Sequence, residues 1–294
     1  MIKVTDLSKN FGELKALDKV SFSVPKGSIF GLVGANGAGK STLMRIIAGI
    51  YTADDGSVLI NDEPVYDNPA AKTHLVFVPD RMHLTGGGAT IERMANFYAS
   101  CYPKFSFEKF DALLNIFKLD KKRRVRSLSK GMVRQVQTVL ALSCNADVLL
   151  FDETFDGLDP IARLIYRDMC DFGSTVILTS HSLRELEDTC DRFAMLYQGK
   201  IVFQNDLADA KSQLFKVQLA FARQVTPEDF KDVELLSFTK QGSIVYVLVR
   251  GEAAETSAKI EALKPLIMDM LPLSIEEFFT YELSSLGYNF DEIK

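Results

Sequence analysis

Residues 34–41 read Gly34-Ala35-Asn36-Gly37-Ala38-Gly39-Lys40-Ser41, and this stretch decides the fold. The residues before it, 28–33, are almost all apolar and predict a buried strand. A glycine-rich turn after such a strand lets backbone N–H groups point at phosphate oxygens, and the following helix adds its positive dipole end. Lys40 is placed to reach β- and γ-phosphates, and Ser41 to ligate Mg²⁺. The stretch predicts a nucleoside triphosphate site, with an unliganded strand-to-helix turn as the alternative.

Length and composition fit a globular protein. The chain has 294 residues, 47% of them apolar, enough for one large domain or for a large and a small one. The net charge of −5 gives no reason to expect a nucleic-acid partner, and the basic run at residues 121–126 is interpreted as a solvated loop. The cysteines are widely spaced, which predicts reduced thiols: Cys101, Cys144, Cys170 and Cys190.

No signal peptide or membrane span is expected from the sequence. Lys3, Asp6 and Lys9 interrupt the first ten residues, where a signal peptide has its apolar core. No stretch approaches the ~20 apolar residues that cross a bilayer. Any membrane role is therefore expected to act through a partner.

Apolar runs alternate with helical patterns through the first 206 residues. Helical spacing is seen at residues 42–50 and through most of residues 90–146. Further strands are expected at residues 2–7, 20–24, 57–60, 148–151 and 175–178. The last two runs are nearly all apolar, as are strands buried on both faces of a parallel sheet. This alternation predicts an α/β core.

The pattern changes after about residue 207. Alternating segments predict strands at residues 216–221, 233–238 and 243–249. Gln241-Gly242 is expected to form a hairpin turn, and Ser274 to begin a helix after an earlier one at residues 252–264. This region is expected to form a separate small α+β domain over residues 208–294. Residues 1–207 then form a nucleotide-binding domain, with a helical subdomain at about residues 82–146.

Two adjacent acids follow the apolar run at residues 148–151. Asp152 and Glu153 stand at the carboxyl end of the expected strand, the edge where doubly wound sheets bind ligands. Neighbouring side chains on a strand point in different directions, so the two carboxylates can take different roles. Asp152 is placed to hold Mg²⁺ through water, and Glu153 to orient and deprotonate an attacking water. The alternative is a pair of acids that cap the next helix.

Segments on either side of these acids carry a family resemblance. Leu128-Ser129-Lys130-Gly131-Met132 precedes them and Gly157-Leu158-Asp159-Pro160 follows them. With these segments, the chain resembles the ATP-binding-cassette (ABC) transporter ATPases over residues 1 to about 206. An aromatic residue before the phosphate loop, a loop residue that is usually glutamine and a switch histidine also occur in the family's order, at Phe11, Asp80 and His181. The resemblance implies a P-loop NTPase core of ABC type, with an antiparallel β flank and a helical subdomain.

The resemblance implies ATP and Mg²⁺ as cofactors and a head-to-tail dimer that holds two ATP molecules at its seam. Ser129 and Gly131 would approach the γ-phosphate bound by the opposite chain. Phe11 would stack on adenine, with a core or edge-strand aromatic as the alternative. His181 would contact the γ-phosphate and steady Glu153. The remaining nucleotide contacts would come from the phosphate loop, Thr42 and Asp159.

Three positions depart from the common family pattern. Asp80 stands where glutamine usually joins the Mg²⁺ shell, and as a carboxylate it is expected to join Ser41 and Asp152 there. Lys130 and Met132 replace glycine and glutamine, a variant that resembles bacterial exporter ATPases of the ABC-2-like type. Thr154 replaces a common proline, which we expect to be a mild change.

The resemblance favours the ATPase subunit of a bacterial export-type transporter. Closure of its ATP-bound homodimer would energise a separately encoded membrane subunit at the cytoplasmic face of the membrane. A soluble cassette that acts on ribosomes or DNA is the alternative, although no basic linker or coiled-coil insert occurs here. A regulator without hydrolysis is disfavoured because Lys40, Asp152, Glu153 and His181 are all present. The transported substrate cannot be inferred from the sequence, because the cassettes of this family contact the nucleotide and the membrane subunit and not the substrate.

The expected C-terminal domain contains no recognisable catalytic cluster. Its apolar residues predict a role in holding or regulating the dimer, with an ordinary core as the alternative: Leu263, Leu266, Ile267, Leu271, Phe278 and Phe279.

Overall fold

The computed structural model describes residues 1–80, 88–154, 173–181, 189–206, 214–271 and 273–285. The chain divides into two compact units, Met1–Gln204 and Asn205–Lys294. Each unit has its own apolar core. The two units are described separately below.

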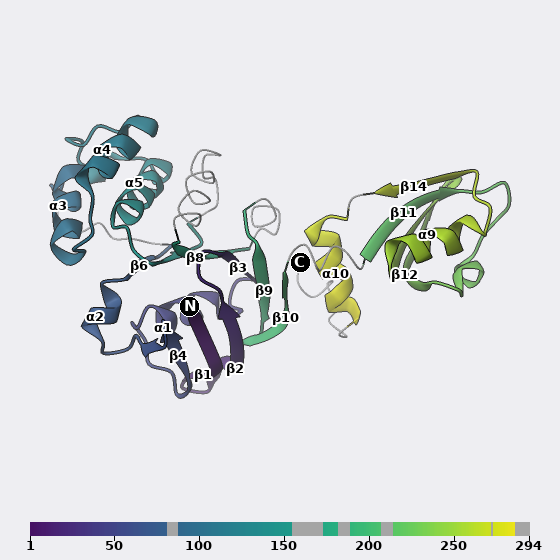
Figure 1. Ribbon diagram of the computed structural model, residues 1–294, viewed down its shortest axis with the longest axis horizontal. Helices are drawn as coiled ribbons and strands as arrows, with labels where there is room; N and C mark the ends of the chain where they lie inside the picture. Colours follow the sequence, from purple (N-terminus) through teal and green to yellow (C-terminus); the bar gives the residue numbers. More distant parts are fainter. Residues whose placement is uncertain (81–87, 155–172, 182–188, 207–213, 272, 286–294) are drawn as a thin grey trace. The chain divides into compact units, whose positions relative to one another are not determined.

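A six-stranded sheet forms the centre of the first unit (Figure 1). Its strands, in the order β10-β9-β3-β8-β7-β6, are β3 (Ile29–Val33), β6 (Leu75–Val78), β7 (Val148–Asp152), β8 (Thr175–Ser180), β9 (Arg192–Tyr197) and β10 (Lys200–Asp206). Strands β3, β7 and β8 are buried along their whole length and pair in parallel. Their apolar sequences fit this position, because helices or a second sheet cover both faces of a parallel sheet.

A four-stranded antiparallel sheet flanks this core. It has the order β2-β1-β4-β5, with β1 (Ile2–Phe11), β2 (Leu14–Val24), β4 (Asp55–Ile60) and β5 (Glu63–Pro64). Helix α1 (Lys40–Ile47) buries Leu43, Met44 and Ile47 in the core that it shares with both sheets. Each such side chain contributes roughly 1.5–3 kcal/mol to stability on burial. The antiparallel flank that we expected is confirmed, and β1 and β2 are longer than predicted.

The helical part of this unit lies apart from α1 (Figure 1). It contains α3 (Ile91–Cys101), α4 (Phe107–Ile116), the 3₁₀ turn η1 (Val125–Ser127) and α5 (Lys130–Ser143), and a short helix, α2 (Pro69–Lys72), lies before β6. Thr90, Ser106 and Ser129 cap the three long helices, each accepting a backbone N–H through its hydroxyl. None of the described helices is long and apolar enough to cross a membrane.

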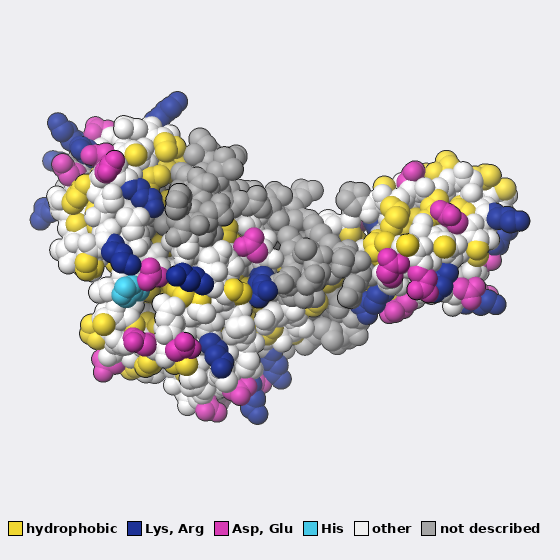
Figure 2. All heavy atoms as spheres, viewed as in Figure 1, with side chains coloured by type: hydrophobic (Ala, Val, Ile, Leu, Met, Phe, Trp, Pro, Cys, Tyr) yellow, Lys and Arg dark blue, Asp and Glu magenta, His cyan; other side chains and the backbone are white. Residues whose placement is uncertain are grey.

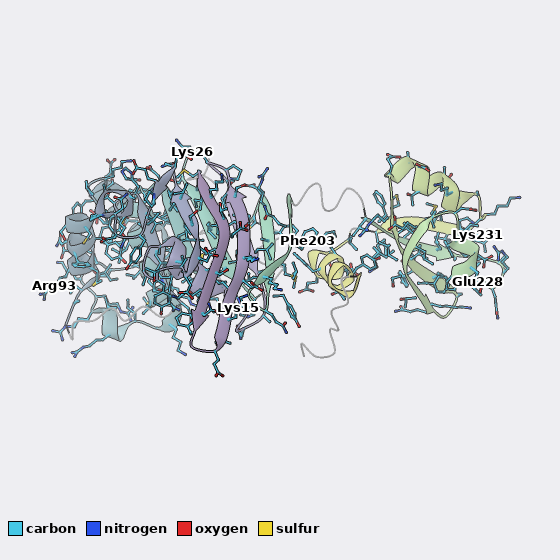
Figure 3. All side chains as sticks on the ribbon, turned by 90° about the horizontal axis from the view of Figure 1, so that it is seen from below. Lys15, Lys26, Arg93, Phe203, Glu228 and Lys231 are labelled. Carbon is cyan, nitrogen blue, oxygen red and sulfur yellow. The ribbon has the colours of Figure 1, made fainter. Side chains whose placement is uncertain are left out.

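The second unit is built on another four-stranded sheet. Its strands run antiparallel in the order β12-β13-β11-β14, with β11 (Leu214–Ala220), β12 (Glu234–Gln241), β13 (Ile244–Arg250) and β14 (Ile267–Leu271). Helix α9 (Ala253–Glu261) and the 3₁₀ turn η2 (Pro227–Phe230) supply Ile260 and Phe230 to the core of this unit. The succession resembles a split βαβ arrangement whose first helix is reduced to η2. Helix α10 (Ile275–Ser285) follows β14. Figure 3 shows two side chains at the surface of this unit, Glu228 of η2 and Lys231, which directly follows η2.

Candidate functional site

The phosphate loop connects β3 to α1. Gly39 precedes α1 with a φ of 107°, in the left-handed region, and a Cβ at this position would lie 2.6 Å from the Ala16 carbonyl oxygen of β2. Glycine is therefore required here by both conformation and space. No side chain caps the N-terminus of α1, so its first N–H groups remain available to an anion.

Lys40 lies inside this loop and is 4% exposed. Its Nζ donates to the carbonyl oxygens of Gly34 at 2.6 Å and Ala35 at 3.3 Å. The same Nζ forms an ion pair with Glu153 Oε1 at 3.1 Å. The lysine and the acid that were expected to act on one nucleotide are therefore in direct contact.

Asp152, the last residue of β7, is buried beside the start of α1. Its Oδ1 accepts hydrogen bonds from Ser41 Oγ at 3.1 Å and from Thr179 Oγ1 at 2.8 Å. Its Oδ2 has no hydrogen-bond partner among the described residues. Burial raises the pKa of Asp152, and the two hydroxyl hydrogen bonds only partly oppose this. A buried carboxylate oxygen without a protein donor is suited to a cation ligand.

Thr179 is a site residue that sequence reasoning missed. It lies opposite Asp152 in the register of β7 and β8 and is completely buried. Besides donating to Asp152, its Oγ1 accepts the backbone N–H of Glu153 at 2.8 Å. Glu153 has a φ of 49°, an uncommon conformation for a residue other than glycine. The available signal was a hydroxyl that directly follows the apolar residues 176–178 and stands two residues before His181.

The strand register places His181 at the same edge of the sheet. Val33 and Ser180 form the last pair of β3 and β8, so Gly34 and His181 are the next residues on two neighbouring strands. His181 is exposed. Parallel strands thus bring the phosphate loop, the two acids and the histidine together.

These residues fit the Mg²⁺ that the family resemblance implies. Mg²⁺ prefers oxygen ligands and takes only one or two carboxylates beside nucleotide phosphates and water. The unpartnered Oδ2 of Asp152 and the neighbouring Ser41 hydroxyl are oxygen donors of this kind. No group of three or more His, Cys, Asp or Glu side chains suited to a metal occurs in the described parts of the chain.

Phe11 ends β1 on the hairpin that borders the phosphate loop. It pairs with Leu14 at the start of β2, and Ala16 two residues further on touches Gly39. The Phe11 ring is 45% exposed and makes an edge contact with the ring of Tyr51, at 5.8 Å between centroids. An open aromatic face near the loop is suited to stacking on a nucleobase.

Asp80 follows β6 and is exposed in this structure. Its Oδ1 lies 3.8 Å from Nη2 of Arg134, a residue of α5. The ion pair joins the loop after β6 to the helix that begins beside Ser129. The expected contact of Asp80 with Mg²⁺ stays a prediction.

Ser129 and Gly131 lie at the start of α5, away from the residues gathered around Lys40. Both are exposed, and a Cβ on Gly131 would meet nothing within 4 Å. Ser129 Oγ accepts the Met132 N–H at 3.3 Å and so caps the helix. No described contact joins either residue to the phosphate loop of its own chain. Asp159 lies outside the described residues.

A cavity of about 1120 Å³ lies elsewhere, in the second unit, between the sheet and α10. Lys216 of β11 and Glu277 of α10 form an ion pair at its wall. It contains none of the residues gathered around Lys40. A phosphate loop binds through backbone N–H groups of a turn and needs no deep cavity, so the loop is the candidate site.

Comparison with known proteins agrees with this geometry. The ABC transporter family model matches residues 17–156. The chain is 34% identical over 216 residues to the uncharacterized ABC transporter ATP-binding protein MJ1023 of Methanocaldococcus jannaschii, covering 71% of this chain and 78% of the relative. It is 28% identical over 284 residues to the ABC transporter ATP-binding protein YtrB of Bacillus subtilis (strain 168), covering 95% and 97%.

A solved structure described as the ATP-binding subunit of an ABC transporter has the same fold. It superposes with a TM-score of 0.65 at 28% identity and covers 72% of this chain and 92% of its own. The expected ABC-type P-loop fold is confirmed. The chain belongs to the ABC transporter family of ATP-binding proteins, which are ATPases that bind ATP together with Mg²⁺.

Proposed function

We propose that this protein is the ATPase subunit of an export-type ABC transporter and that it acts through a separately encoded membrane subunit. The main support is the cluster of Lys40, Ser41, Asp152 and Glu153 around the phosphate loop. Export is favoured by a relative that is 33% identical and named Nod factor export ATP-binding protein I, from Sinorhizobium fredii (strain NBRC 101917 / NGR234). A methionine import protein is less similar, at 27%. The subunit would sit at the cytoplasmic face of the membrane.

The nucleotide would be held by the turn and by the side chains around it. Backbone N–H groups of residues 34–42 would surround the phosphates, and Lys40 would leave Glu153 to contact the β- and γ-phosphates. Ser41 and Asp152 would hold Mg²⁺, with Asp80 as a further ligand. Bound Mg²⁺ supplies positive charge that offsets the charge developing on the phosphates.

Hydrolysis would depend on the acid that Lys40 releases. Glu153, held by Thr179 through its backbone, would orient the attacking water and accept its proton. His181 would donate a hydrogen bond to the γ-phosphate. Phe11 would stack on adenine, which adds affinity with little discrimination between bases.

A second copy would complete the site. Ser129 and Gly131 are exposed at a helix N-terminus and make no described contact with the loop of their own chain. In a head-to-tail dimer they would approach the γ-phosphate held by the partner. Closure of the seam around two ATP molecules would be transmitted to the membrane subunit through the helical part that contains α3, α4 and α5.

Copurification tests the transport role. A tagged chain expressed in its native membrane background is expected to bring down a polytopic membrane protein, and an isolated complex should hydrolyse ATP. Ala substitutions on exposed side chains of α3, such as Phe97→Ala at 61% exposure, should weaken the complex if α3 contributes to docking. A chain that copurifies with ribosomes or DNA, and with no membrane protein, would contradict the proposal.

A further inference from the structure

The edge strand β14 exposes an unusual amount of apolar surface. Ile267 and Met270 of this strand are 51% and 47% exposed, and Leu266, directly before it, is 70% exposed. Strand β14 pairs with β11 along one side and meets no other strand in the described part of the chain. Figure 2 shows hydrophobic side chains on the surface of the second unit where Figure 1 places β14.

The opposite edge of the same sheet is protected. Strand β12 has a register irregularity between Leu235 and Ser237 and carries Glu234 and Lys240. Bulges and charges, lysine above all, are the usual means by which sheet edges avoid pairing with other chains. Strand β14 has an unbroken register with β11, no lysine, and Asp269 as its one charged residue. The β14 edge is therefore less protected against pairing with another strand than the β12 edge.

We propose that β14 pairs antiparallel with β14 of a second copy, so that two four-stranded sheets join into one. A sheet edge favours another strand as its occupant, because strand addition satisfies its unpaired N–H and C=O groups. The apolar residues lie on both faces of β14: Met268 and Met270 oppose Leu219 and Val217, and Ile267 opposes Ala220. An identical strand matches this length and presents apolar residues on both faces as well.

The proposal rests on the proposed function in one respect, that two copies work together. A five-residue strand pair is weak by itself. When two cassettes share a seam, the two β14 strands belong to one assembly, and a contact within an assembly needs less affinity of its own than one between free chains. Pairing would be isologous, the same surface on both chains.

Symmetry makes a specific prediction about side chains. In a continuous antiparallel sheet with a twofold axis perpendicular to it, the axis passes midway between the two strands, and the residue nearest to it lies opposite its own copy. The central residues of β14 are the candidates: Met268, Asp269 and Met270. One of these positions should therefore form a disulfide between copies much more readily than the others.

Cysteine scanning of the full chain, with the buried Cys144 and Cys190 kept, tests this. Cys101 and Cys170 are first replaced by serine, and cysteine is then introduced at residue 268, 269 or 270. Ser243→Cys, on the exposed β12–β13 hairpin, is the control for random collision. Mild oxidation is expected to crosslink one β14 variant at least tenfold faster than Ser243→Cys. Crosslinking no faster than the control at all three positions would overturn the proposal.

A lysine substitution provides the second measurement. Ile267→Lys, at an exposed β14 position outside the cysteine scan, is expected to lower crosslinking through the best cysteine position at least tenfold, because it adds the charge that protects other edges. Ile116→Lys, at a site 46% exposed on α4, is the matched control and should change nothing. Trapping of MgATP by a Glu153→Gln chain is measured in parallel. Crosslinking without trapping would contradict only the proposed function, and trapping without crosslinking only this inference.

Discussion

Asp152 and Thr179 show how a few polar atoms define the site at the scale of single residues. The Asp152 carboxylate is 1% exposed and one of its oxygens is unpartnered in the described part of the chain. Thr179 fixes the other oxygen and also the backbone of Glu153. One hydroxyl on the adjacent strand β8 therefore positions both Asp152 and Glu153.

Replacing Thr179 with valine should lower both stability and turnover. The change leaves the Asp152 oxygen with one donor fewer and the Glu153 N–H without its acceptor, which costs about 1–3 kcal/mol. Misplacement of Glu153 should reduce kcat roughly tenfold or more, since 1.4 kcal/mol is a tenfold change in rate. Thr179→Ser should restore most of the activity because it keeps the hydroxyl.

Thr175→Val is the matched control for this substitution. Thr175 is also fully buried on β8, at the opposite end of the strand, where its Oγ1 accepts the Gly27 N–H at 3.0 Å. Thr175→Val should lower the melting temperature about as much as Thr179→Val does and should leave kcat unchanged. Equal losses of kcat in both variants would show that Thr179 acts only through stability.

Asp152→Asn is expected to stabilise the metal-free protein. Burial raises the pKa of Asp152 in the folded state, so folding favours the protonated carboxyl and stability falls as pH rises through the window between the unfolded and folded pKa values. The neutral amide removes this loss. In EDTA, the melting temperature of the variant should exceed that of the wild type by an amount that grows with pH.

With Mg²⁺ and ATP present, the wild type should melt at a higher temperature than Asp152→Asn. Mg²⁺ would bind the wild-type carboxylate more tightly than a neutral amide, so MgATP should raise the melting temperature of the wild type much more than that of Asp152→Asn. A variant that is destabilised in EDTA at every pH, or stabilised by MgATP as much as the wild type, would contradict the role given to Asp152.

At the scale of elements, the sequence predicted the strands that carry the site and missed others. The runs at residues 28–33, 148–151 and 175–178 are nearly all apolar because both faces of β3, β7 and β8 are covered. Strand β6 has only four residues and was not predicted. Strand β14 was missed because its exposed apolar residues do not alternate with polar ones.

Contacts between elements could not be predicted from the sequence either. The Lys40–Glu153 ion pair depends on the order in which β3 and β7 flank β8, which no local pattern gives. The Asp80–Arg134 pair likewise joins a loop to a helix more than fifty residues later in the chain. Sequence reasoning placed each residue on the correct kind of element and left its partner open.

The roles of Asp80 and Arg134 can be distinguished by how substitution of each changes the Mg²⁺ dependence of ATPase activity. If Asp80 joins the metal shell, Asp80→Ala should raise the Mg²⁺ concentration for half-maximal ATPase about tenfold, the lower end of the cost of losing an outer-shell partner. Arg134→Ala removes the same ion pair but no metal ligand. It should leave the Mg²⁺ dependence unchanged and cost at most about 1 kcal/mol of stability, because the pair is partly exposed.

The same Mg²⁺ response in both variants would contradict the role of Asp80 as a metal ligand. If Asp80→Ala and Arg134→Ala shift the Mg²⁺ requirement equally, or neither does, Asp80 acts through its ion pair and not at the metal. Initial ATPase rates over a Mg²⁺ titration at fixed ATP distinguish these cases.

At the scale of the whole molecule, the chain divides into two compact units, and the domain assigned to each from the sequence stays a prediction. Sequence reasoning set the boundary at residues 207–208, and the compact units meet at Gln204 and Asn205. The apolar residues that suggested a dimer contact separate into two groups: Phe278 and Phe279 are buried, whereas Leu266 and Ile267 are exposed. A sequence pattern cannot make this division, because burial depends on which elements pack together.

Gly131 offers the most direct test of a nucleotide seam between two chains. An aspartate at this position in the first turn of α5 has open space and a favourable interaction with the helix dipole, so Gly131→Asp should keep or raise the melting temperature. Its carboxylate would nevertheless face the partner's γ-phosphate. The same substitution should therefore leave nucleotide binding to a single chain unchanged and prevent closure.

Retention of radiolabelled ATP through gel filtration measures closure directly. Glu153→Gln, which keeps Thr179 and the metal ligands but lacks the base, is expected to retain MgATP. The double variant Glu153→Gln with Gly131→Asp should release it, despite an unchanged melting temperature and unchanged binding of a fluorescent ATP analogue at equilibrium. Equal retention by the two variants would contradict the claim that Ser129 and Gly131 complete the site of a second copy.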